Sequence, residues 1–122
     1  MLEETDLPGL RVFAVSSSQL GAEARHIANA IERMNDPRVR HYWDEEKRVG
    51  TAVMPLLEGL DTPAWDVWLL YSPGVTWEDA GAPAPDWWEH QLNALWDRHP
   101  DRRLEAERLA AKAVELTRSA EP

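Results

Sequence analysis

Two extended runs separated by an amphipathic stretch constrain the fold of this chain more than any other feature. Residues 11–15, RVFAV, are apolar on consecutive positions, which is typical of a strand buried on both faces. Residues 17–34 carry apolar side chains at helical spacing and are followed by NDP at 35–37, which ends a helix. Residues 38–43, RVRHYW, then alternate as an edge strand does. A helix that joins two strands in this way makes them parallel, and we expect a right-handed crossover here.

The middle of the chain predicts a second helix and a hairpin. Residues 44–60 keep a helical period, with acidic side chains in the first turn and an interruption at Pro55. Residues 65–71, WDVWLLY, are apolar on both faces with one exception and predict a second central strand. A tight turn over 72–74 is expected to lead back into a short edge strand at 75–77.

Two further helices are predicted after the hairpin. The first covers residues 86–99, with Asp86 as its N-cap. Glu89 is expected in its first turn, where the helix dipole favours an acidic side chain, and His90 is expected to face solvent. Its buried stripe consists of Trp88, Leu92, Leu95 and Trp96. Residues 101–119 form the second helix, because they are rich in strong helix formers, although their apolar stripe is thin.

The order of these elements predicts an α/β fold. The two central strands, at 11–15 and 65–71, are expected to be neighbours, with an edge strand on either side in the order 2-1-3-4. The result is a four-stranded mixed sheet between helices, in a three-layer α/β/α sandwich with an extra C-terminal helix. We therefore expect one domain over residues 1–100 and a C-terminal helical extension over 101–122.

This element order resembles the thioredoxin fold over residues 11–96. The pair Thr62-Pro63 stands just before the third predicted strand, where the resemblance implies a cis-proline beside the active site. The segments WDVWLLYSPGVTW and PDWWEHQL, within residues 65–92, are also similar to bacterial thioredoxin-like proteins that have no known activity. The resemblance therefore implies a thioredoxin-like domain and carries no reaction with it.

The absence of cysteine decides against thiol chemistry. The resemblance places the Cys-x-x-Cys pair of thioredoxins between Leu20 and Glu23, where this chain reads LGAE, and the whole chain has no cysteine. A thiol–disulfide oxidoreductase, a disulfide and a cysteine-ligated zinc site are therefore excluded. The resemblance implies a redox-inactive relative.

Charge and hydropathy exclude further classes of protein. The chain has 22 acidic and 13 basic residues and a formal net charge of −9, which opposes binding to nucleic acid or to anionic membranes. No apolar run approaches transmembrane length, and the acidic start MLEETDLPGL lacks the apolar segment of a signal peptide. We expect a cytoplasmic protein without a nucleic-acid or membrane partner.

The resemblance brings the ends of the predicted strands to one edge of the sheet. In open α/β sheets, ligands commonly bind at this edge, outside the carboxyl ends of the strands. We expect a shallow groove there, in which tryptophans surround a proline and serines follow the first strand. These candidate binding residues are Ser17, Ser18, Trp43, Thr62, Pro63, Trp77 and Trp87. The alternative is that the tryptophans close the end of the sheet as core, since indoles are more often buried than exposed.

No catalytic or metal-binding motif accompanies this groove. The four histidines do not form the His-Glu-x-x-His pattern of a helical zinc site. The serines at 16–18 lack the Gly-x-Ser-x-Gly setting of a nucleophile and are better interpreted as a loop and helix cap. We assign no catalytic residue, metal or cofactor.

Two classes of function stay open. The leading hypothesis is a redox-inactive thioredoxin-like binding or interaction module, whose partner is a protein or a small molecule. The alternative is a small-ligand-binding protein or minor enzyme that uses the Trp-lined groove at the carboxyl end of the sheet. A homodimer through the C-terminal helix or an edge strand is a third hypothesis.

Overall fold

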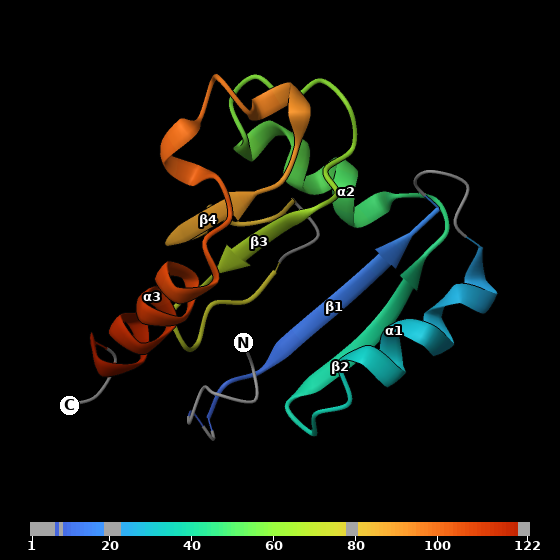
Figure 1. The fold of residues 1–122 in the computed structure, drawn as a ribbon, viewed down its shortest axis with the longest axis horizontal. Helices are drawn as coiled ribbons and strands as arrows, with labels where there is room; N and C mark the ends of the chain where they lie inside the picture. Colours follow the sequence, from blue (N-terminus) through green and yellow to red (C-terminus); the bar gives the residue numbers. More distant parts are fainter. Residues whose placement is uncertain (1–6, 8, 19–22, 78–80, 120–122) are drawn as a thin grey trace.

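The computed structural model describes residues 7, 9–18, 23–77 and 81–119, and every element below lies in those ranges. Within them the strands form two separate sheets of two strands each. The N-terminal pair of strands lies on one side of the molecule, and the C-terminal pair lies on the other side with the last helix (Figure 1).

The N-terminal sheet is the predicted parallel pair. Strands β1 (Val12–Ser17) and β2 (Val39–Asp44) run parallel, and the 3-10 helix η3 (Ala24–His26) and the helix α1 (Ile27–Arg33) lie on the crossover between them. Parallel pairing is therefore confirmed, as is a helix between the strands. Residues 19–22, in the predicted start of that helix, lie outside the described residues and include most of the segment compared with the thioredoxin cysteines.

One face of this sheet is covered and the other is open. Ala14 and His41 point toward α1 and line a cavity with it. Phe13, which is 64% exposed, and Tyr42, which is 45% exposed, lie on the opposite face. The prediction that the first strand is buried on both faces is therefore wrong, because α1 covers only one face of a two-stranded sheet.

Asp44, the last residue of β2, caps the next helix. Its two carboxylate oxygens accept the backbone N–H groups of Arg48 and Val49 at 2.8 Å each. These bonds satisfy the first turn of α2 (Arg48–Val53), whose N–H groups have no partner within the helix. The 3-10 helix η4 (Met54–Leu56) follows and contains the proline at which an interruption was expected.

The second sheet contains one predicted strand and one unpredicted strand. β3 (Val67–Leu70) confirms a strand within the predicted residues 65–71, but its central position is wrong, because it lies in a sheet of two strands. Its partner is β4 (Trp87–His90), which runs antiparallel to it. The predicted hairpin to residues 75–77 is wrong, and so is the helix predicted over 86–99. Residues 71–86 instead form a long connection between the two strands, of which 78–80 lie outside the described residues.

A two-residue period explains why β4 is a strand. Trp87 and Glu89 contact each other on one face, and Trp88 and His90 contact each other on the opposite face. Aromatic residues favour strands. Glu89, which the helical prediction placed in a first turn, and His90, which it placed facing solvent, are both fully buried. The apolar spacing that predicted a helix continues instead into the 3-10 helix η5 (Asn93–Leu95).

The chain ends in the 3-10 helix η6 (Pro100–Arg102) and the helix α3 (Ala106–Ser119), and α3 confirms most of the predicted C-terminal helix. The hydrophobic core lies among α2, β4 and η5. Its buried members are Val53, Leu57, Ala64, Trp88, Leu92 and Leu95.

These pairings contradict the predicted fold class. In the described ranges no strand pairing joins β1 to β3, so the four-stranded mixed sheet of order 2-1-3-4 is not formed. The thioredoxin-like α/β/α sandwich is therefore a wrong prediction. The physical reason is that β4 provides the hydrogen-bonding partner of β3, while β1 pairs with β2 alone. The Thr62–Pro63 bond is trans, in contrast to the cis-proline that the resemblance implied.

Candidate functional site

Three of the predicted binding residues meet at the carboxyl end of the parallel sheet. Ser17 lies opposite Asp44 in the strand register. The Ser18 hydroxyl donates to the carbonyl oxygen of Glu45 at 2.9 Å, and the indole N–H of Trp43 donates to the Glu45 carboxylate at 2.7 Å. The structure therefore places Ser17, Ser18 and Trp43 at the same end of the sheet, where the polar groups of Ser18 and Trp43 bind the turn at Glu45.

The other four predicted residues have different neighbours. Thr62 is exposed, and Pro63 is half-buried beside α2. Trp77 is exposed and lies edge-on to Tyr71, with 6.2 Å between ring centroids. Trp87 lies between β4 and α3. The three tryptophans of the predicted groove have separate surroundings, and the described residues contain no ring contact between them.

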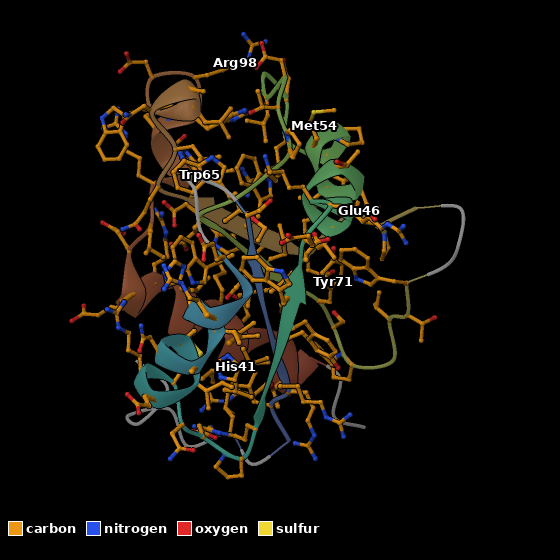
Figure 2. All side chains as sticks on the ribbon, turned by 90° about the vertical axis from the view of Figure 1, so that its right-hand side faces the viewer. His41, Glu46, Met54, Trp65, Tyr71 and Arg98 are labelled. Carbon is orange, nitrogen blue, oxygen red and sulfur yellow. The ribbon has the colours of Figure 1, made fainter. Side chains whose placement is uncertain are left out.

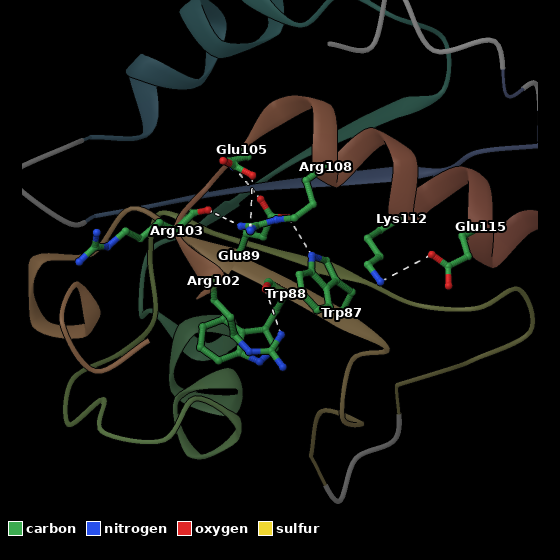
Figure 3. A network of polar contacts seen from close by, with 9 residues as sticks. All are labelled: Trp87, Trp88, Glu89, Arg102, Arg103, Glu105, Arg108, Lys112 and Glu115. Carbon is green, nitrogen blue, oxygen red and sulfur yellow. Dashed lines mark hydrogen bonds and ion pairs between the residues drawn. The ribbon is translucent and has the colours of Figure 1, made fainter. Parts of the chain in front are cut away.

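Trp87 belongs to a polar network between β4 and α3 whose centre is Glu89 (Figure 3). The Glu89 side chain is 0% exposed. Its carboxylate accepts the indole N–H of Trp87 at 2.7 Å, the backbone N–H of Glu105 at 2.7 Å and the Nε–H of Arg108 at 3.1 Å. Glu89 thus caps the start of α3 and pairs with a cation from its first turn.

The pKa of Glu89 lies below its usual value although the side chain is buried. Burial alone raises this pKa, because it disfavours the charged form. The hydrogen bonds from Glu105, Trp87 and Arg108, together with the charge of Arg108, lower it further than burial raises it. Glu89 is therefore a fixed anion that joins a strand to a helix, and its pKa shift is opposite to that of a general acid.

Three cations surround the Trp87 indole. The guanidinium carbons of Arg102 and Arg108 lie 4.8 and 5.6 Å from its ring centroid, and the Lys112 ammonium lies 4.7 Å from it. Arg102 also lies 4.7 Å from the Trp88 ring and donates to the Trp88 carbonyl at 3.2 Å. Burial, followed by the charge of Arg108, lowers the pKa of Arg102. Trp87 therefore packs within the strand–helix junction, at distances typical of cation–π contacts.

His90 is the second buried polar residue that the sequence did not place correctly. Its Nδ1 accepts the backbone N–H of Leu92 at 3.1 Å, so the proton lies on Nε2, which is 3.2 Å from the His99 carbonyl oxygen. A two-residue alternation along residues 87–90 is compatible with a strand, but the burial of both side chains depends on the distant elements that cover each face.

A surface that no prediction named lies on the open side of the parallel sheet. We call its residues, Phe13, Val15, Arg40 and Tyr42, the outer face; all four are exposed. The rings of Phe13 and Tyr42 are in contact, with 6.2 Å between their centroids. In most parallel sheets a helix covers each face, so this apolar surface is unusual for a parallel pair.

In the part of the chain that the structure describes, no three His, Asp or Glu side chains gather in a way that could hold a metal ion. The helices there are all too short or too polar to cross a membrane. No protein-family model matches the chain, and no curated protein or solved structure matches it either.

Proposed function

We propose that this protein is a binding module without redox chemistry, which takes an acidic and partly apolar polypeptide segment on its outer face. The observation that carries this proposal is the contact between two exposed rings, Phe13 and Tyr42, on the uncovered face of the β1–β2 sheet. Single exposed apolar residues are common on protein surfaces, but exposed apolar residues that form a contiguous patch are typical of interaction sites.

The strand register makes the outer face one continuous patch. Phe13 lies opposite Arg40, and Val15 lies opposite Tyr42. Neighbouring strands lie about 4.8 Å apart, so the four side chains occupy adjacent positions on one face. Aromatic residues and arginine are also the residues most enriched at the energetic centres of protein interfaces.

The charge of the outer face supports an acidic partner. The patch contains the cation Arg40 and no carboxylate, in a chain whose net charge is −9. A segment with Asp or Glu beside apolar residues complements both properties of this surface. A second copy of this chain complements it less well, because a two-fold symmetric contact brings the two Arg40 side chains toward each other.

The strand edges support an extended partner. β1 and β2 pair only with each other among the residues that the structure describes. Each of the two strands therefore has one edge without a strand partner. Backbone N–H and C=O groups on such an edge can pair with an added strand, and alternate side chains of that strand then lie on the aromatic patch.

The test is a selection of random linear peptides, displayed on phage, against the purified full chain. We expect enrichment of sequences in which apolar and acidic residues alternate. A labelled selected peptide is then titrated with protein variants and followed by fluorescence anisotropy. Phe13→Ser combined with Tyr42→Ser is expected to raise the Kd by about 30-fold or more, as loss of an interface hot spot does.

Trp77→Ser provides the matched control, because Trp77 is an exposed aromatic residue outside the outer face. This variant is expected to leave the Kd within about twofold. Circular dichroism checks that each variant is folded. The proposal fails if Trp77→Ser weakens binding as much as the double variant does, or if the double variant selects the same peptides.

A further inference from the structure

The free edges of the four strands differ in what lies beside them. On β4, the carbonyl oxygen of Trp88 accepts a hydrogen bond from Arg102 at 3.2 Å. The carbonyl oxygen of His90 accepts the backbone N–H of Leu104 at 2.9 Å, so this edge is occupied. The strands follow in the order β4, β3, β1 and β2 across the molecule, so the free edges of β3 and β1 are turned toward each other, whereas that of β2 is turned away from the other strands (Figure 1). Among the described strands, β2 therefore offers the edge that a partner can approach from outside.

Two residues of β2 direct unpaired backbone groups to this edge. The carbonyl oxygen of Arg38 accepts the backbone N–H of Val12 at 2.9 Å, so the even-numbered residues of β2 bond to β1 and the odd-numbered ones point away from it. The N–H of Val39 is bonded to the turn that precedes the strand. The backbone groups of His41 and Trp43, in contrast, have no hydrogen-bond partner in the part of the chain that the structure describes. These four groups can pair with an added strand.

The end of α1 lies over β2 on the covered face of the sheet. Nε2 of His41 is 3.1 Å from the carbonyl oxygen of Met34, and Figure 2 shows His41 between α1 and β2. Ile31 and Met34 are one turn apart on α1 and are 44% and 38% exposed. This end of the helix therefore presents apolar side chains that its own sheet does not cover, next to the strand whose edge is open.

Arg40 gives the opposite face of β2 a different character. Its side chain is exposed on the outer face, and among the described residues no ion pair joins it to a carboxylate, in a chain whose net charge is −9. Residues opposite each other on paired strands have Cβ atoms about 5 Å apart, which is within reach of a charge pair. A strand added to β2 therefore meets an unpaired cation on one face and apolar side chains on the other.

From this open edge and its two unlike faces we infer that the polypeptide segment of the proposed function binds by adding a strand to β2, with an acidic side chain opposite Arg40 and apolar side chains beneath the end of α1. The inference rests on the proposed function and specifies the edge, the backbone pairing and the pattern of the partner. In an antiparallel arrangement the residues opposite His41 and Trp43 exchange backbone hydrogen bonds with them. Successive side chains of the added strand point to opposite faces, so the partner carries an acidic residue directly next to an apolar one.

The first test concerns the backbone of the partner. In a selected linear peptide, each N–H is replaced in turn by an N-methyl group, and the Kd for the full chain is measured by fluorescence anisotropy. Only alternate N–H groups of an added strand face β2, so we expect the Kd to rise by about tenfold or more at alternate positions and to change little between them.

The second test identifies the edge. Amide proton exchange of the ¹⁵N-labelled full chain is followed by NMR with and without a saturating concentration of the same peptide. Exchange at His41 and Trp43, on the edge of β2, is expected to slow by about tenfold more than exchange at Phe13 and Val15, on the edge of β1.

The third test uses variants of the two faces. Ile31→Ser combined with Met34→Ser is expected to raise the Kd by about tenfold or more, and Val75→Ser, an equally exposed apolar position outside this surface, is expected to leave it within about twofold. Arg40→Gln is expected to remove the preference for a peptide with Glu over the same peptide with Gln opposite this position. Arg25→Gln, which changes another highly exposed arginine, is expected to keep that preference.

The inference is overturned if N-methylation is tolerated at every position, or if the peptide protects the edge of β1 as strongly as that of β2. Equal losses in the Ile31/Met34 variant and in Val75→Ser also overturn it. In each of these cases a Kd that still rises in the combined Phe13→Ser and Tyr42→Ser variant leaves the proposed function intact. A selection that yields no peptide overturns both.

Discussion

At the scale of single residues, Glu89 is expected to make a large contribution to stability. Glu89→Gln removes a fully buried charge that faces Arg108 and two N–H donors. We expect the free energy of unfolding, measured by urea denaturation, to fall by about 3 kcal/mol, because loss of one partner leaves the others unpaired. Glu107→Gln, an exposed change in the first turn of the same helix, is expected to stay within about 0.5 kcal/mol. Equal losses in the two variants contradict the assignment of Glu89 as the centre of the network.

The pH dependence of this effect follows from the sign of the pKa shift. The pKa of Glu89 is lower in the folded protein than its usual value, although burial opposes this, because Glu105, Trp87 and Arg108 hydrogen-bond to the ionised form. Its stabilisation is therefore complete above the unfolded-state pKa of about 4.3 and is lost as the pH falls through the folded-state value. Urea denaturation at a series of pH values is expected to show a constant difference between the native chain and Glu89→Gln above about pH 5 and a shrinking one below it. A difference that grows on acidification rules out this linkage.

At the scale of elements, the packing of α3 separates two hypotheses for the C-terminal helix. Leu109 is 2% exposed within the single chain, so the helix contacts its own domain there. Leu109→Ala is expected to reduce the free energy of unfolding by about 2–5 kcal/mol, and Leu116→Ala, which is only half-buried, by less. If α3 instead packs mainly against a second copy, the thermal midpoint depends on protein concentration, and both substitutions remove that dependence.

Strand β4 is the element at which sequence reasoning failed, and its residues show why. The run WWEH satisfies a helical stripe with Leu92 and Leu95, and it equally satisfies a two-residue period. Only distant groups decide between the two: β3 pairs along the run, and Glu105 and Arg108 provide the partners of Glu89. β1, β2, β3 and α3, in contrast, were predicted correctly in type.

At the scale of the whole molecule, burial is distributed unevenly. The buried hydrophobic residues of the described chain lie between Val53 and Leu109, and none lies in β1, α1 or β2. We expect backbone amides of β1 and β2 to exchange with deuterium through openings of lower free energy than those of β3 and β4. Hydrogen exchange followed by mass spectrometry measures this directly, and equal protection of the two sheets contradicts the expectation.

A selected peptide, added at a saturating concentration and bound to the outer face, is expected to slow exchange more in β1 and β2 than in β3 and β4.

The sequence by itself determined the chemistry that is excluded and the local elements: no thiol reaction is available without cysteine, and the parallel crossover follows from one helix between two strands. Those properties depend on composition and on periods within about 20 residues. Tertiary structure alone decided that β3 pairs with β4, that Glu89 is buried and that Phe13 is exposed. The physical reason is that strand pairing and burial are set by groups far apart in the chain, which local periodicity does not contain.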